Sequence, residues 1–160
     1  MTGLDAGTLY AVAYKLDLST VFADLVRCET RLYNALNDRL RERHGIVTSQ
    51  FEFLRYLRYH PEARVADLAA EFAIGVGATS KAADRLERNG WVVRLRNPAD
   101  RRSSLLALTS AGQTLAEAAE LTFGAALAEF VGDALGEPMA RALAQLRSDL
   151  ERRNLGMPTG

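Results

Sequence analysis

The sequence contains few of the residues with which proteins build metal or redox sites. It has one cysteine and two histidines in 160 residues, and these are not closely spaced. The single cysteine, Cys28, excludes an intrachain disulfide, and we interpret it as a small buried hydrophobic residue rather than a redox sensor. No HExxH helix, nucleophile elbow or glycine-rich phosphate loop is present. The sequence therefore predicts no metal site, no cofactor and no catalytic residues, so we do not expect an enzyme.

Long apolar runs are also lacking. No uncharged apolar stretch reaches about 18 residues, so no membrane span is predicted. The first residues, MTGLDAGTLYAVAYKLD, lack the basic and apolar regions of a signal peptide. We therefore expect a cytoplasmic protein without a membrane partner.

An excess of charge is the third absence, because the formal net charge is zero. A neutral chain is a poor candidate for indiscriminate binding to nucleic acid. The charges are unevenly distributed, however: residues 76–109 carry seven basic and three acidic residues, whereas residues 110–160 carry four and seven. Focused positive charge is typical of a site-specific nucleic-acid binder. The alternative is that these arginines only solvate a helix and a hairpin.

Apolar periodicity predicts one mainly helical domain, residues 1–160, with a small hairpin. Thr48 is the predicted N-cap of the second helix, and Gly45 and Gly90 are predicted to end helices in the left-handed conformation. The predicted helices cover about residues 17–43, 48–59, 67–72, 75–88, 110–131 and 138–153, and the predicted strands about residues 64–65, 91–96 and 106–108.

The segment from Arg64 to Thr109 is the most informative part of the chain. It combines two short helices with a hairpin that has a basic tip, an arrangement in which a helix enters one groove of DNA and the hairpin reaches the next. On the second of these helices, residues 75–88, we expect one face to be buried and the other to point outward. The expected buried residues are Val76, Thr79, Ala82 or Ala83, and Leu86, and the expected outward residues are Gly77, Ser80, Lys81, Asp84, Arg85 and Arg88.

Three of the outward side chains have an expected role at DNA. Lys81 can reach guanine in the major groove, and Ser80 can bind a base or a phosphate. Arg85 is expected either to meet phosphate or to pair with Asp84 or Asp100. The alternative for the whole set is an ordinary solvated helix face.

The hairpin tip adds a second group of candidates. Arg102 is expected to enter a narrow minor groove and Arg101 to meet phosphate, because a narrow groove attracts arginine. We expect Asp100 to orient an arginine by a bidentate pair rather than to touch DNA. Arg94 and Arg96, on the flanking strand, are further candidates for phosphate contacts.

The terminal helices, residues 9–44 and 110–154, carry more apolar surface than one small monomer can cover. A homodimer built from them is the expected remedy, and packing of the two ends within one monomer is the alternative. A pocket for a small molecule is expected beside these helices. Its candidate lining residues supply aromatic and cationic groups, although packing in the core or interface is the favoured role for each: Phe22, Tyr33, Phe51, Arg55 and Tyr59.

The order of motifs resembles that of the MarR family of transcriptional regulators. The resemblance rests on VADLAAEF, ADRLERNGWVVR, NPADRR and LALTSAGQ, in about residues 64–113. It implies a winged helix-turn-helix module over residues 46–109, flanked by dimerisation helices. It also implies a dimer that places one helix in the major groove and one wing in the minor groove. The DNA-binding residues expected on this basis are Gly77, Ser80, Lys81, Arg85, Arg101 and Arg102, with Asp100 orienting the wing.

The resemblance further implies repression that is relieved by a small phenolic or aromatic effector. We therefore expect a dimeric DNA-binding regulator, a repressor of a pseudo-palindromic operator. The start of the recognition helix departs from the family, because Gly75, Gly77 and Ala78 leave few side chains to read bases. Together with the zero net charge, this supports an alternative: a winged-helix protein-interaction subunit that has lost specific DNA readout.

Overall fold

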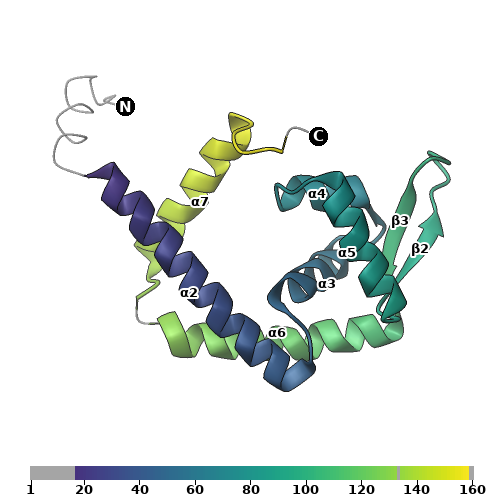
Figure 1. The fold of residues 1–160 in the computed structure, drawn as a ribbon, viewed down its shortest axis with the longest axis horizontal. Coiled ribbons are helices and arrows are strands. Elements are labelled where there is room, and N and C mark those ends of the chain that lie inside the picture. The colour runs from purple at the N-terminus through teal and green to yellow at the C-terminus, as the bar shows by residue number, and fades with distance from the viewer. Residues whose placement is uncertain (1–16, 133, 159–160) are drawn as a thin grey trace. The chain divides into compact units, whose positions relative to one another are not determined.

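The computed structural model describes residues 17–132 and 134–158 and divides the chain into two compact units, residues 1–35 and 36–160. The mainly helical fold with a small antiparallel sheet, predicted from the sequence, is confirmed (Figure 1). Residues 9–16 of the predicted first dimerisation helix lie outside the described residues. The elements are α2 (Leu18–His44), α3 (Thr48–Tyr59), β1 (Ala63–Arg64), α4 (Val65–Glu71), α5 (Val76–Arg88), β2 (Val92–Arg96), β3 (Ser104–Leu108), α6 (Ser110–Val131) and α7 (Glu137–Arg152).

The first unit consists of the N-terminal part of α2. Asp17 caps this helix by accepting hydrogen bonds from the Ser19 amide, at 3.1 Å, and from the Thr20 hydroxyl. Most side chains of this part are exposed, including five apolar ones. Cys28 is also exposed, so the expectation of a buried cysteine is wrong. The exposed apolar side chains are Leu18, Val21, Phe22, Leu25 and Val26.

In the second unit, helix boundaries follow from local hydrogen bonds. Gly45 ends α2 at a φ of +67°, as predicted. Thr48 is not the N-cap of α3, because Val47 takes that position and donates its amide to Gln50 Oε1 at 3.0 Å. The side chain of the glutamine at the third helical position thus caps the N-terminus of α3 by accepting the hydrogen bond of the N-cap amide. Thr48 becomes the first helical residue and is 1% exposed.

A hydrogen bond of the same kind, from the N-cap amide to the side chain of the third helical residue, starts α4 slightly before the predicted residue. The Arg64 amide donates to Asp67 Oδ2 at 2.7 Å, so the helix begins at Val65. At α5, the hydroxyl of buried Thr79 donates to the Gly75 carbonyl at 3.0 Å. This bond fixes the first turn of α5 with Thr79 pointing inward.

The sheet of the second unit has the strand order β1-β3-β2, all antiparallel. Leu106 of β3 pairs with both Ala63 and Arg94, and its side chain is fully buried. The core cluster around it joins residues of α3, α4, α5 and α6 to the sheet. Its buried members are Phe53, Leu54, Leu57, Ala63, Leu68, Ala83, Leu86, Val92, Leu106 and Ala116.

The start of α6 is joined to the base of the hairpin. The Thr109 amide donates to the Trp91 carbonyl at 3.0 Å, and the Thr109 hydroxyl both donates to the Gly90 carbonyl at 2.6 Å and accepts from the Gly112 amide at 3.1 Å. A Cβ at position 112 would overlap the Trp91 carbonyl oxygen. Gly112 is therefore required by close packing of α6 against the hairpin.

Within the part of the chain that the structure describes, we find no helix with the length and apolar character needed to cross a bilayer.

We predict that Gly112→Ala destabilises the fold by about 2 kcal/mol or more, because the new methyl group collides with backbone that cannot rotate away. Gly124→Ala is the matched control on the same helix, since a Cβ there meets no atom within 4 Å. It should raise stability by up to about 1 kcal/mol through helix propensity. Urea unfolding followed by circular dichroism measures both, and equal effects of the two substitutions would contradict the packing argument.

Candidate nucleic-acid interface

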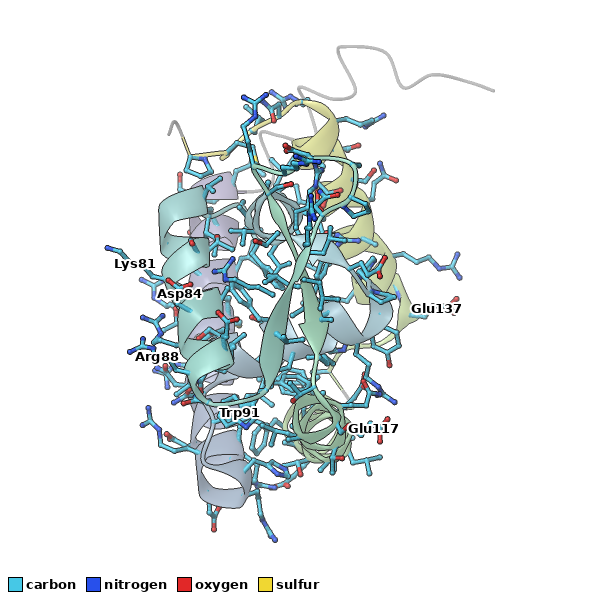
Figure 2. All side chains as sticks on the ribbon, turned by 90° about the vertical axis from the view of Figure 1, so that its right-hand side faces the viewer. Lys81, Asp84, Arg88, Trp91, Glu117 and Glu137 are labelled. Carbon is cyan, nitrogen blue, oxygen red and sulfur yellow. The ribbon has the colours of Figure 1, made fainter. Side chains whose placement is uncertain are left out.

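The outer face of α5 carries the predicted cationic side chains. Thr79, Ala83 and Leu86 are buried against the sheet, so the opposite face points to solvent. Figure 2 shows Lys81, Asp84 and Arg88 projecting from one side of the helix. Of the six predicted outward residues, Ser80 is half-buried and the others are exposed. The structure therefore brings the predicted residues of α5 together on one accessible face.

Arg94 of β2 contacts two acidic side chains of α5. Its Nη2 lies 2.6 Å from Asp84 Oδ1 and its Nε lies 3.3 Å from Glu87 Oε2. Its amide also donates to Glu87 Oε1 at 3.3 Å. Two carboxylates of α5 hold the guanidinium, and its contact with phosphate stays a prediction. This Arg94 bridge joins α5 to the wing and offsets half of the negative charge of the two acidic groups.

The wing turn between β2 and β3 is ordered by short polar side chains. Buried Asn97 accepts a hydrogen bond from the Ala99 amide at 2.9 Å and donates to Ser103 Oγ at 2.8 Å. Asp100 Oδ1 accepts from the Arg102 amide at 3.0 Å. Asp100 thus orients the turn through the backbone, whereas we expected a bidentate pair with an arginine side chain. Both Arg101 and Arg102 are exposed at the tip.

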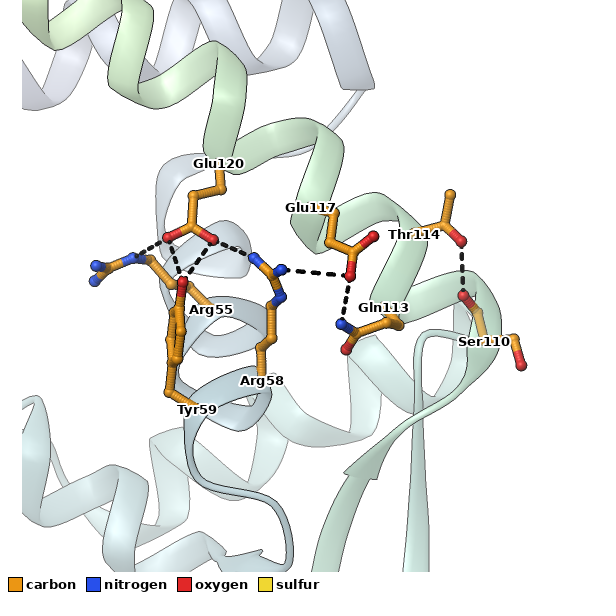
Figure 3. Close-up of polar contacts among 8 residues, drawn as sticks. All are labelled: Arg55, Arg58, Tyr59, Ser110, Gln113, Thr114, Glu117 and Glu120. Atoms are coloured by element: carbon orange, nitrogen blue, oxygen red, sulfur yellow. Dashed lines mark hydrogen bonds and ion pairs between the residues drawn. The ribbon is translucent and has the colours of Figure 1, made fainter.

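A polar cluster ties α3 to α6 (Figure 3). Glu120 of α6 accepts hydrogen bonds from Arg55 Nε at 3.1 Å, Arg58 Nη1 at 2.5 Å and Tyr59 Oη at 3.0 Å. Glu117 also lies 3.4 Å from Arg58 Nη2. Burial raises the pKa of Glu120, but hydrogen bonds from Arg55 and Tyr59 and the charges of Arg55 and Arg58 outweigh it. The net pKa is below its ordinary value, so the carboxylate stays charged and binds all three partners.

Two of the predicted ligand-binding residues line a cavity in the structure. Arg55 and Tyr59 border a space of about 250 Å³ between α3 and the end of α4. Its other lining residues are Glu52, Tyr56, His60, Glu71 and Phe72.

The remaining predicted ligand residues do not belong to this cavity. Phe51 is fully buried, with its ring 4.7 Å from that of Phe123, so its predicted place in a pocket lining is wrong and it is a core residue. Phe22 and Tyr33 lie in the first unit, where Phe22 is 66% exposed and Tyr33 is half-buried. Their role in ligand binding stays a prediction.

Sequence reasoning missed the partners Arg58, Glu117 and Glu120. A signal was present, because Arg55, Arg58 and Tyr59 are spaced by three and four residues and so share one face of a helix. Glu117 and Glu120 share a face of another helix in the same way. The pattern within each helix does not reveal that the two faces meet, since that depends on packing.

Comparison with known proteins places this geometry in context. The model of the MarR family matches residues 46–104, which include α3, β1, α4, α5 and β2 and end at the first residue of β3. MarR of Salmonella typhimurium, a multiple antibiotic resistance protein, is 30% identical over 105 residues, 62% of this chain and 73% of that protein. An uncharacterized HTH-type transcriptional regulator of Bacillus cereus is 26% identical over 136 residues, 85% of this chain and 90% of that protein.

Solved structures agree with these relatives. A substituted MarR from E. coli, complexed with operator DNA, has a TM-score of 0.69 at 26% identity, covering 80% of this chain and 91% of that chain. Sco3205 of Streptomyces coelicolor, a MarR family regulator in complex with DNA, has a TM-score of 0.77 at 22% identity, covering 99% and 96%. The second likeness supports the fold alone. With its winged-helix fold and its similarity to MarR, the chain belongs to the MarR family of transcriptional regulators.

Proposed function

We propose that this regulator is a homodimeric repressor of a pseudo-palindromic operator, with α5 in the major groove and the β2–β3 wing in the adjacent minor groove. The observation that carries the proposal is the Arg94 bridge, which fixes the cationic face of α5 to the wing. A rigid pair of reading elements suits two adjacent grooves. The E. coli MarR structure with operator DNA supports this function by similarity.

In this proposal each residue of the interface has a stated role at the DNA. Lys81 donates to guanine in the major groove, Arg85 meets phosphate, and Ser80 binds a base or a phosphate. Gly77 lets the helix approach the DNA closely, since it has no side chain and open space around it. On the wing, Arg102 enters the minor groove and Arg101 meets phosphate.

We predict that Lys81→Ala weakens operator binding by roughly 1–3 kcal/mol and relaxes the preference for one base pair. Arg102→Ala should weaken binding and remove the preference for a narrow A·T-rich minor groove under the wing. Fluorescence anisotropy, with a duplex selected from random DNA and excess unrelated competitor, measures each effect. Arg41→Ala removes the same charge from exposed α2, outside the winged-helix module, and should bind like the wild type.

The same assay separates the protein-interaction alternative, for which the scarcity of side chains at Gly75, Gly77 and Ala78 is the supporting feature. An interaction subunit would bind DNA only weakly, lose that binding with added salt, and yield no selected sequence. Selection of one palindromic sequence, with loss on Lys81→Ala, would exclude that alternative.

We further propose that the terminal helices, residues 9–44 and 110–154, form the homodimer. The exposed apolar residues of α7 recur every three or four positions, and each is 38–46% exposed. The N-terminal part of α2 carries a second exposed apolar set. Soluble monomers rarely expose apolar stripes of this size without a partner. The residues of the α7 stripe are Met139, Leu143, Leu146 and Leu150.

We predict that Leu146→Glu converts the dimer to a monomer, because it places a charge in the middle of the α7 stripe. Ser148→Glu is the matched control, since it adds the same charge to the opposite, exposed face of α7. Sedimentation velocity measures the mass of each variant. A Leu146→Glu variant that stays dimeric with native helix content would exclude α7 from the interface.

We propose that a small aromatic or phenolic effector relieves repression by binding the cavity beside Arg55 and Tyr59. The cavity offers aromatic rings from Tyr56, Tyr59 and Phe72, together with the cation of Arg55. An acidic effector would compete with Glu120 for Arg55 and Tyr59 and so loosen the contact between α3 and α6. The position of α5 relative to the dimer would then change, and half-site spacing is sensitive to such a change.

We predict that some member of a panel of aromatic acids and phenols releases the operator, and that Arg55→Ala reduces this response at least about tenfold. Arg43→Ala is the control, because Arg43 lines a different cavity of about 300 Å³ between α2 and α6. Titration of the protein–DNA complex with each compound gives the half-release concentration. If Arg43→Ala reduced the response and Arg55→Ala did not, the effector site would be the second cavity.

A further inference from the structure

Val76 is the residue of α5 whose position differs most from expectation. The periodicity predicts that it is buried, but its side chain is 57% exposed and lies outside both core clusters. Buried Thr79 and its hydrogen bond to the Gly75 carbonyl fix the first turn of the helix in this orientation. The fold therefore presents a branched apolar side chain at the N-terminal end of the recognition helix.

The neighbours of Val76 leave it accessible. Gly75 and Gly77 flank it, and a Cβ added to either glycine would meet no heavy atom within 4 Å. Lys81 follows five residues further along the helix and is exposed on the outward face. In a helix-turn-helix, the N-terminal end of the second helix contacts base edges. Val76 is the first residue of α5 and is thus the apolar side chain nearest that end.

Valine can recognise only one feature of the major groove. It neither donates nor accepts hydrogen bonds, and the edges of guanine, cytosine and adenine present donors and acceptors there. Thymine alone adds a methyl group, on C5, which packs against apolar side chains. Contact with that methyl group would remove an exposed apolar surface from water on both sides.

We propose that Val76 is a specificity-determining residue that reads the C5-methyl group of one thymine in each operator half-site. This inference rests on the proposed DNA-binding function. It assigns sequence readout to the end of α5 where Gly75 and Gly77 have no side chain and Ala78 has only a methyl group. Lys81 then reads a base by hydrogen bonding, while Val76 reads its base by apolar contact.

The test replaces each thymine of the selected operator, in symmetric pairs, by deoxyuridine, which pairs identically but lacks the methyl group. Wild-type protein should lose affinity about fourfold per half-site, hence roughly 15-fold for the pair, at one thymine position. Val76→Ala should bind the thymine and uracil duplexes equally at that position. Lys81→Ala is the matched control, and it should keep the full thymine preference there despite weaker binding overall.

Each outcome decides between possibilities. Two results would overturn the role of Val76: a loss of affinity on uracil substitution that is the same for Val76→Ala as for the wild type, or no loss of affinity at any thymine. In either case, wild-type binding to the selected operator would still support DNA recognition. If selection returns no operator, the proposed function itself fails, and the inference fails with it. Circular dichroism confirms that Val76→Ala is folded, which alanine at an exposed helical position favours.

Discussion

The geometry of the candidate interface depends on two carboxylates of α5 that hold one guanidinium of β2. Asp84 and Glu87 would repel a phosphate backbone if they were left without a cation, and the single charge of Arg94 is shared between them and offsets half of theirs. The same contacts join β2 of the wing to the helix that carries Lys81. Asn97 and Asp100 then complete the arrangement by ordering the wing turn through hydrogen bonds to its backbone.

A second link joins the reading module to α6 through Glu120. Its charged state is secured by three donors of α3, so α3 and α6 move together as long as these bonds last. Because Arg55 and Tyr59 serve both this link and the neighbouring cavity, a ligand cannot bind them without affecting the link. This shared use gives the proposed effector a physical route to the DNA-binding elements.

Local sequence predicted the elements well, because their ends are set by nearby residues such as Gly45, Gly90 and Thr109. It failed where packing decides. Phe51 resembles a pocket residue by type, yet it fills the core beside Phe123. Arg94 resembles a phosphate ligand, but only the folded hairpin brings it beside Asp84 and Glu87. Helical periodicity assigns Val76 to the buried face, yet at the first position of α5 its side chain is left exposed.

The neutral net charge of the chain is consistent with the proposed way of binding DNA. The cations of α5 and the wing are few, so they make few phosphate contacts, and a binder with few such contacts gains little non-specific affinity and loses little with salt. Its discrimination must then come from direct base contacts and from the shape of the DNA. An apolar contact by Val76 suits this requirement, because packing against a methyl group does not depend on ionic strength. The zero net charge, which argues against indiscriminate binding to nucleic acid, is therefore consistent with a nucleic-acid partner that is recognised selectively.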